Sequence, residues 1–255
     1  MGVERRHFGL IGHPVAHSKS AQYFEEKWRD LDLDGCSYTL HDLPNLDALP
    51  RLWDSRVWSG MNVTVPHKQS VMPLLDGLSP EAEAIGAVNT IAFTAAGRIG
   101  YNTDAVGFRR AIAPFLESHQ DRALVLGTGG SSAAVVHVLR AIGIDVTRVS
   151  RNPVEPGDIT YGDIGREGLA ATPMLVNCTP VGMHPDVDGI PPLSQAALDG
   201  FGPRHFLVDL IYSPRQTVLM KCASTRGAKT LDGFSMLHLQ ADAAWEIWTG
   251  GAAAQ

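Results

Sequence analysis

Short apolar runs rich in β-branched and aromatic residues alternate with amphipathic stretches along the chain. In the first part of the chain the runs predict strands at residues 7–11, 36–41, 61–65, 87–93 and 98–101. Apolar positions with helical spacing predict helices at residues 20–31, 45–54, 67–75, 79–85 and 103–118. The helix over 79–85 should have Ser79 as its N-cap and Pro80 as its first residue. Because strands and helices alternate, we expect an α/β fold of parallel strands covered by helices.

A second alternating run begins at residues 123–126, where a fully apolar strand leads into Gly127-Thr-Gly-Gly-Ser-Ser132 and a helix over 130–142. Strand, glycine turn and helix in this order are typical of dinucleotide-binding folds. Gly127 permits the tight turn, Gly129 lets a pyrophosphate approach the backbone, and the helix N-terminus supplies N–H donors. Further strands are predicted at 145–149, 174–177 and 205–209, and further helices at 215–224 and 234–249.

The strand over 145–149 ends in Ser150-Arg-Asn152, where an NAD enzyme usually carries an acid for the ribose hydroxyls. No acid stands there, and Arg151 offers a guanidinium to a 2′-phosphate. This pattern favours NADP. The alternative is that Arg151 is a solvated loop residue.

Two dense polar motifs precede the glycine turn: Gly60-Met-Asn-Val-Thr-Val-Pro-His-Lys68 and Tyr101-Asn-Thr-Asp104. A helix beginning near Pro66 would place Lys68 in its first turn, where the positive end of the helix dipole disfavours a protonated lysine. A lysine so placed can exchange protons near neutral pH. The alternative is a solvated surface lysine, the usual state of this residue type.

The length of 255 residues predicts one large or two modest domains. A hydrophobic content of 44%, a charged content of 19% and a net charge of −6 describe an ordinary globular protein and argue against a nucleic-acid or membrane surface. The apolar run over residues 8–11 is too short for a signal sequence or a membrane span.

The three cysteines, Cys36, Cys178 and Cys222, are far apart, which favours reduced thiols and a cytoplasmic protein. His13 and His17 have the spacing of helical metal ligands, but Pro14 separates them. We therefore expect no metal site.

The polar and glycine-rich motifs together resemble those of the shikimate dehydrogenase family, whose members reduce 3-dehydroshikimate with NADPH in aromatic amino-acid biosynthesis. The resemblance runs over residues 8–250. Its motifs occur in family order: Gly12-His-Pro-Val-Ala-His-Ser-Lys-Ser20, Gly60 to Lys68, Gly86-Ala-Val-Asn-Thr90, Asn102-Thr-Asp104, Gly127-Thr-Gly-Gly130, Asn177-Cys-Thr-Pro-Val-Gly-Met183 and Gly233-Phe-Ser-Met-Leu-His-Leu-Gln240.

The resemblance implies a two-domain α/β architecture. Residues 1–101 should form the substrate domain, to which residues 235–255 return with the last helix. Residues 102–234 should form a Rossmann-like NADP-binding domain. The cleft between the two should hold the hydride donor against the substrate.

By position, the resemblance implies that Lys68 and Asp104 are the catalytic pair at the reacting oxygen. Carbonyl reduction needs a hydride at carbon and a proton or positive charge at the developing alkoxide. Lys68 can act as the acid in reduction and the base in oxidation, while Asp104 orients it. Whether Lys68 transfers the proton or mainly stabilises charge stays open.

The resemblance also assigns substrate and cofactor contacts. Ser18 and Ser20 match the site of the substrate carboxylate, and hydroxyls at a helix N-terminus suit an anion, although a serine there can be a plain N-cap. Thr64, Asn89 and Gln240 match positions that bond ring hydroxyls, and Tyr212 matches a substrate-side tyrosine. The cofactor positions are Gly127, Thr128, Gly129, Gly130, Ser131, Ser150, Arg151, Asn152, Thr179, Met183, Gly233 and Met236. For Met183 and Met236 a simple core-filling role is the alternative.

The expected partner is a small molecule, shikimate or 3-dehydroshikimate, with no nucleic acid and no membrane, bound by a monomer or homodimer. Two other functions stay open. One is a quinate/shikimate dehydrogenase that uses NAD. The other is a non-catalytic ligand sensor on the same fold, against which the intact Lys68 and Asp104 count.

Overall fold

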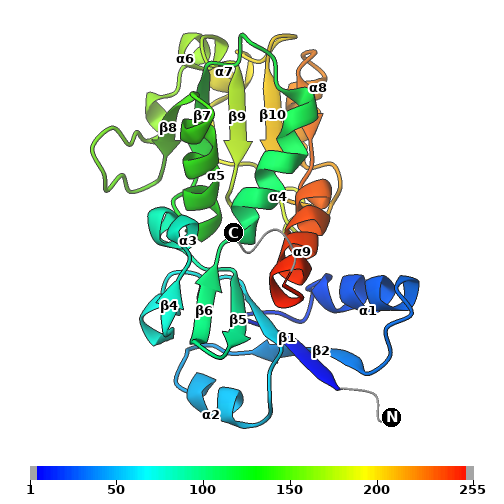
Figure 1. Cartoon of the computed structure of the whole chain (residues 1–255). Helices are drawn as coiled ribbons and strands as arrows, with labels where there is room; N and C mark the ends of the chain where they lie inside the picture. The colour runs from blue at the N-terminus through cyan, green and yellow to red at the C-terminus, as the bar shows by residue number, and fades with distance from the viewer. Residues whose placement is uncertain (1–4, 251–255) are drawn as a thin grey trace. The chain divides into compact units, whose positions relative to one another are not determined.

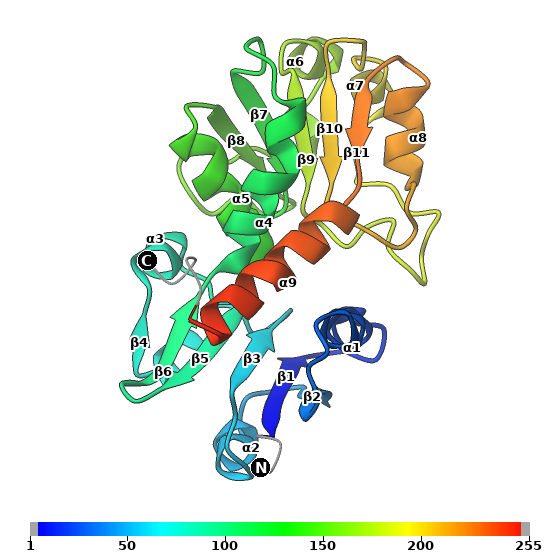
Figure 2. The ribbon, with the colours of Figure 1, turned by 45° about the vertical axis from the view of Figure 1, so that its right-hand side comes forward.

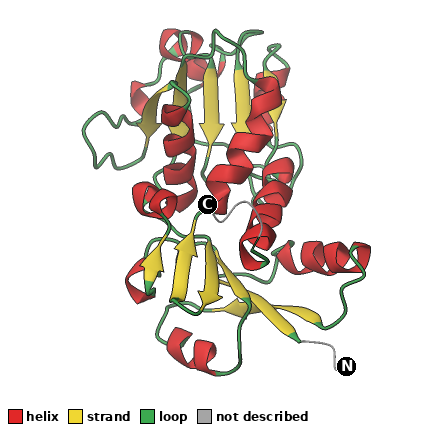
Figure 3. Cartoon of the chain, in the orientation of Figure 1, coloured by secondary structure: helices red, strands yellow, loops and turns green. Residues whose placement is uncertain are grey.

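The computed structural model describes residues 5–250. The chain divides into two compact units, Met1–Val106 with Gln240–Gln255, and Gly107–Leu239. Each unit is a sheet with helices packed against it (Figures 1 and 3), which confirms the α/β class. Among the described residues, no helix combines the length and apolar character that a membrane crossing requires.

The sheet of the first unit has the strand order β2-β1-β3-β5-β6-β4. Its strands are β1 (Arg6–Gly12), β2 (Cys36–Asp42), β3 (Gly60–Val63), β4 (Gly77–Leu78), β5 (Thr90–Thr94) and β6 (Gly97–Tyr101). Its helices are α1 (Ser20–Asp30), α2 (Leu49–Asp54) and α3 (Pro80–Ile85). Ser79 caps α3 by accepting from the Ala82 N–H at 3.2 Å, so the predicted cap is confirmed.

The expectation of parallel strands is wrong for part of this sheet, because β5 runs antiparallel to both β3 and β6. A tight hairpin joins β5 to β6, with Thr94 opposite Gly97. A connection this short can join only antiparallel strands. The sequence pattern predicted these strands except the short β4, but it did not predict their directions.

The helix predicted over residues 67–75 does not form; a 3₁₀ turn over Met72–Leu74 is the helical part of this stretch. The Lys68 carbonyl accepts from the Val88 N–H at 2.7 Å and is not available to a following helical turn. Pro73 has no N–H to continue one. The helix-dipole argument for Lys68 is therefore wrong.

Two other helices begin or end several residues from the predicted position, in each case near a proline. α2 begins at Leu49, with Pro50 in its first turn, rather than at 45. α4 (Thr103–Ile112) ends six residues before the predicted 118 and passes into a 3₁₀ turn that contains Pro114.

The second unit is an all-parallel sheet in the order β11-β10-β9-β7-β8. Its strands are β7 (Arg122–Leu126), β8 (Asp145–Val149), β9 (Met174–Asn177), β10 (Phe206–Asp209) and β11 (Lys229–Leu231). Its helices are α5 (Gly130–Ala141), α6 (Arg166–Ala170), α7 (Gln195–Leu198) and α8 (Val218–Ser224). The predicted Rossmann-like strands are confirmed, whereas the short β11, α6 and α7 were not predicted.

The last helix, α9 (Phe234–Trp248), begins in the second unit and continues into the first at Gln240 (Figure 2). Trp245 and Trp248 pack against Phe8, with ring centroids 5.6 and 4.9 Å apart. Gly60 makes room for Trp248, because a Cβ there would come within 2.3 Å of the indole. Trp248 also donates to the Ile91 carbonyl at 3.0 Å, so these tryptophans are packing residues of the first unit.

Candidate active site

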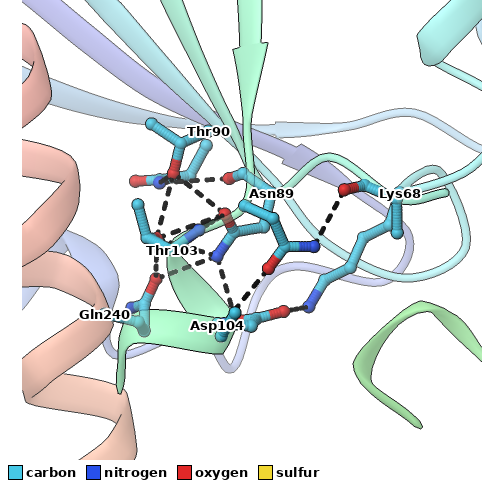
Figure 4. Close-up of polar contacts among 10 residues, drawn as sticks. Lys68, Asn89, Thr90, Thr103, Asp104 and Gln240 are labelled. Atoms are coloured by element: carbon cyan, nitrogen blue, oxygen red, sulfur yellow. Dashed lines mark hydrogen bonds and ion pairs between the residues drawn. The ribbon is translucent and has the colours of Figure 1, made fainter. Parts of the chain in front are cut away.

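The candidate active site of the first unit is centred on Lys68, whose side chain forms an ion pair with Asp104 (Figure 4). Lys68 is 9% exposed and Asp104 is 6% exposed, so the alternative of a solvated surface lysine is wrong. The bond from Val88 holds the lysine segment beside the start of β5. Asp104 lies in the first turn of α4, where the helix dipole favours a carboxylate.

A buried ion pair adds little to stability, because desolvation offsets much of its attraction. The pair here makes further hydrogen bonds. Asp104 Oδ1 accepts from the Asn89 side-chain amide at 2.9 Å, while Oδ2 faces the lysine. Buried and specifically partnered ionisable groups are typical of functional sites.

Asn89 joins this pair to α9. Its Oδ1 accepts from the Thr103 N–H at 2.7 Å, and its Nδ2 lies 3.0 Å from Thr103 Oγ1. Gln240 of α9 places its Oε1 3.4 Å from both Asn89 Nδ2 and Thr103 Oγ1. The structure thus brings Lys68, Asp104, Asn89 and Gln240 together, as Figure 4 shows.

Thr64 is half-buried on the segment that leads from β3 to Lys68. Its methyl group lies against Gly12, where a Cβ would come within 2.3 Å of it. A glycine at that position therefore lets this segment approach the end of β1.

Ser18 and Ser20 lie together at the start of α1. Ser18 Oγ accepts from the Ser20 N–H and donates to Ser20 Oγ, both at 3.2 Å. The N-cap residue of α1 is Lys19, and no side chain caps the helix. The serines are therefore not plain N-caps, and the arrangement suits an anion at the helix N-terminus.

The glycine turn of the second unit has the geometry that its sequence predicts. Gly127 has a φ of +103°, in the region that favours glycine, and donates to the Val149 carbonyl at 2.8 Å. Ser132 is buried and bonds the Gly127 carbonyl at 2.6 Å. Gly129 is the N-cap of α5 and supplies no side-chain cap. The turn with Thr128, Gly130 and Ser131 opens directly into this uncapped helix N-terminus.

Arg151 projects from a turn at the end of β8, in which Ser150 Oγ bonds the Asn152 N–H at 3.2 Å and carbonyl at 3.1 Å. Arg151 is exposed, and none of the ion pairs found within residues 5–250 involves it. An uncapped helix N-terminus and an available guanidinium fit a dinucleotide with a 2′-phosphate.

The remaining cofactor positions follow β9 and open α9. Thr179 donates to Asn177 Oδ1 at 2.7 Å. Gly233 is required locally, because a Cβ there would come within 2.0 Å of the Leu210 carbonyl oxygen. Met183 is 41% exposed and is not core filling, whereas Met236 is 8% exposed and is also part of the core.

Tyr212 lies in the second unit, just after β10, and burial raises the pKa of its hydroxyl. The neighbouring Asp209 is buried and was missed by sequence reasoning. It accepts from the Thr217 hydroxyl at 2.7 Å and from the Asn177 amide at 3.0 Å. Burial raises the pKa of Asp209, and these hydrogen bonds oppose the shift. Its place at the end of a parallel strand was the signal that could have identified it.

Comparisons with known proteins agree with this geometry. Residues 10–91 match the family model described as the shikimate dehydrogenase substrate binding domain. A shikimate dehydrogenase (NADP⁺) from Methanococcus aeolicus is 36% identical over 95% of this chain and 91% of its own length.

Solved structures give the same result. A shikimate 5-dehydrogenase from Thermus thermophilus, in complex with NADP(H) and shikimate, has a TM-score of 0.84 and 34% identity, covering 96% of this chain and 94% of its own. A quinate dehydrogenase from Corynebacterium glutamicum, in complex with NAD, has a TM-score of 0.81 and 29% identity, covering 96% and 94%.

Proposed function

The chain belongs to the NADP-dependent shikimate dehydrogenase family, and from this premise we propose that Lys68 and Asp104 are its acid–base centre. The protein is an oxidoreductase of the shikimate pathway, which interconverts 3-dehydroshikimate and shikimate with NADP as its cofactor. The observation that carries the site assignment is the buried Lys68–Asp104 pair with its amide partner Asn89.

NADPH, when bound, supplies the hydride for this reduction. Charge then develops on the substrate oxygen, where the Lys68 ammonium either gives its proton or stabilises the alkoxide. Asp104 holds the ammonium in place through their ion pair. In the oxidation direction the neutral lysine accepts the proton of the substrate hydroxyl.

The other polar side chains of the first unit bind the substrate. Ser18 and Ser20 donate to its carboxylate at the start of α1. Thr64, Asn89 and Gln240 satisfy its ring hydroxyls, which must keep hydrogen bonds when water is expelled. Tyr212, which belongs to the second unit, is assigned as the substrate-side tyrosine.

The cofactor is held by the glycine turn and by the segment after β8. Gly127, Thr128, Gly129, Gly130 and Ser131 receive the pyrophosphate. Ser150, Arg151 and Asn152 receive the adenosine end with its 2′-phosphate. The cofactor positions nearest the nicotinamide are Thr179, Met183, Gly233 and Met236.

We assign residues 1–101 and 235–255 to the substrate domain and residues 102–234 to the NADP-binding domain, a division supported by the compact units that break after Val106 and before Gln240. The protein acts on its small-molecule substrate in the cytoplasm as a monomer or homodimer. Cys36, Cys178 and Cys222 are half-buried and far apart in the sequence, which supports a reducing compartment.

The function can be tested by following the absorbance at about 340 nm, where reduced nicotinamides absorb. The assay combines shikimate or quinate with NADP⁺ or NAD⁺, which gives four substrate and cofactor pairs. We expect turnover of shikimate with NADP⁺ and a smaller kcat/KM with quinate or NAD⁺. The similarity to a quinate dehydrogenase makes quinate with NAD⁺ the second candidate. If none of the pairs gives turnover while shikimate binds by calorimetry, the protein is a sensor.

A further inference from the structure

Buried polar residues that have no part in the assigned chemistry lie behind the Lys68–Asp104 pair. Thr90, the first residue of β5, is 0% exposed, and Asn62 of β3 and Tyr38 of β2 are buried as well. Asn62 Oδ1 accepts from the Tyr38 hydroxyl at 2.7 Å. Asn62 Nδ2 lies 3.1 Å from Thr90 Oγ1, and Thr90 Oγ1 lies 3.1 Å from Asn89 Oδ1.

Backbone groups fix the orientation of both amides in this series. Asn62 Nδ2 lies 3.2 Å from the Asn89 carbonyl oxygen, which can only accept. Asn89 Oδ1 lies 2.7 Å from the Thr103 N–H, which can only donate. Neither amide can therefore rotate by half a turn without setting two acceptors or two donors against each other.

The hydroxyl directions follow from the fixed amides. Tyr38 must donate to Asn62 Oδ1, because that oxygen can only accept. Thr90 accepts from Asn62 Nδ2 and donates to the nearer of its two acceptors, which is Asn89 Oδ1 at 3.1 Å rather than Thr103 Oγ1 at 3.2 Å. Asn89 in turn donates to Asp104 Oδ1 at 2.9 Å. Every bond in the series thus donates toward Asp104, and its last steps are visible in Figure 4.

The far end of the series is the buried Tyr38 hydroxyl. Burial raises the pKa of Tyr38, and the Ser20 side chain partly opposes this shift. The Tyr38 ring stacks on Phe24 with centroids 4.9 Å apart. The series therefore passes through apolar surroundings, where hydrogen bonds are stronger than in water.

We propose that Asn62 and Thr90 are positioning residues for the reaction, which act by holding the Asn89 amide as a donor to Asp104 while Asp104 holds Lys68. Tyr38 of β2 is the first donor of this series, which continues through Asn62, Thr90 and Asn89 to Asp104. The inference rests on the proposed function of Lys68 and Asp104. Aligned hydrogen bonds polarise one another, by about 10–30% per bond.

Substitutions at Thr90 give a matched test. Thr90→Val keeps the shape and removes the hydroxyl, whereas Thr90→Ser keeps the hydroxyl and removes a methyl group. We expect Thr90→Val to lower kcat for shikimate by about two- to tenfold, the value of one hydrogen bond, with an unchanged KM. Thr90→Ser should keep the wild-type kcat, although it removes more core volume. Tyr161→Phe, which removes a buried tyrosine hydroxyl in the second unit, should leave kcat unchanged.

A second measurement does not depend on activity. The side-chain amide resonances of Asn89, observed by NMR in the full-length ¹⁵N-labelled protein, should move in Thr90→Val and stay in Thr90→Ser. Equal kcat values for wild type and Thr90→Val, or equal losses in the valine and serine variants, would overturn the proposal. Wild-type protein without turnover would refute the proposed function instead, and the NMR comparison alone would then decide the positioning role.

Discussion

At the scale of single residues, the buried position of the Lys68 ammonium beside Asp104 gives the sharpest prediction. Lys68→Ala should lower kcat by about 10²- to 10⁴-fold, the usual contribution of an acid–base group, with an unchanged dissociation constant for NADP. Steady-state kinetics and calorimetry measure both. Lys229→Ala is a matched control, because it removes another paired lysine, exposed in the second unit. Near-wild-type turnover in folded Lys68→Ala would refute the assignment.

Asp104→Asn should be impaired to a similar degree, because the amide no longer offers a negative charge to the ammonium. The double variant Lys68→Ala/Asp104→Asn should lose much less than the product of the single losses, since residues that act as a unit are not additive. A fully multiplicative loss would show that the two side chains act independently.

Ser18 and Ser20 are predicted to hold the substrate carboxylate. Ser18→Ala and Ser20→Ala should each raise KM for shikimate by about ten- to a hundredfold, the value of a hydrogen bond to a charged group, with little change in kcat. Ser55→Ala removes an exposed hydroxyl of the same unit, bonded to the Leu52 carbonyl, and should change neither constant. Normal shikimate binding in both serine variants would move the carboxylate site elsewhere.

At the scale of elements, the segment after β8 is predicted to determine the choice of cofactor. Arg151→Ala should raise KM for NADP by about ten- to a hundredfold and leave KM for NAD nearly unchanged. Because Arg151 is exposed, the preference should shrink as ionic strength rises. Arg122→Ala, which removes an exposed arginine at the start of β7, is the matched control and should change neither KM. Equal effects on both cofactors would make Arg151 a structural residue.

The hairpin between β5 and β6 is held to the segment before β4 by Asp76. Its carboxylate bonds the Arg98 guanidinium and backbone N–H, both at 2.8 Å, which lowers the pKa of Asp76 from 3.8 to about 2. A lowered carboxyl pKa adds stability above the unfolded value and loses it as pH falls through the folded value. Asp76→Asn should therefore lower Tm at neutral pH, and the difference should shrink steadily as pH falls from about 4 to about 2. A Tm difference at pH 2 as large as that at neutral pH would contradict this.

Some of these elements could be predicted from the sequence, and others could not. Strands β7 and β9 are mostly apolar and β8 carries two valines among polar residues, and the limits of all three followed closely from the local sequence. The helix over residues 67–75 was wrong because a distant donor, the Val88 N–H, takes the Lys68 carbonyl, and no local pattern reports such a bond. Asn62 and Thr90 stood inside recognised motifs, but their roles depend on contacts between strands.

At the scale of the whole molecule, each ligand should protect its own unit. Hydrogen exchange measures local opening, and a ligand that binds only the folded state suppresses it. We expect NADP⁺ to slow amide exchange in residues 127–132 and 150–152, because the pyrophosphate and 2′-phosphate engage those backbones. We expect shikimate to slow exchange in residues 60–68 and 87–104, which carry the buried polar side chains.

The Arg151→Ala variant separates these effects. At a fixed NADP⁺ concentration it should lose the protection of residues 127–132 and 150–152, because less cofactor is bound, while shikimate still protects residues 60–68. The matched Arg122→Ala variant should keep both patterns. If NADP⁺ left residues 127–132 unchanged in the wild type, the glycine turn would not be the pyrophosphate site, and its open helix N-terminus would need another explanation.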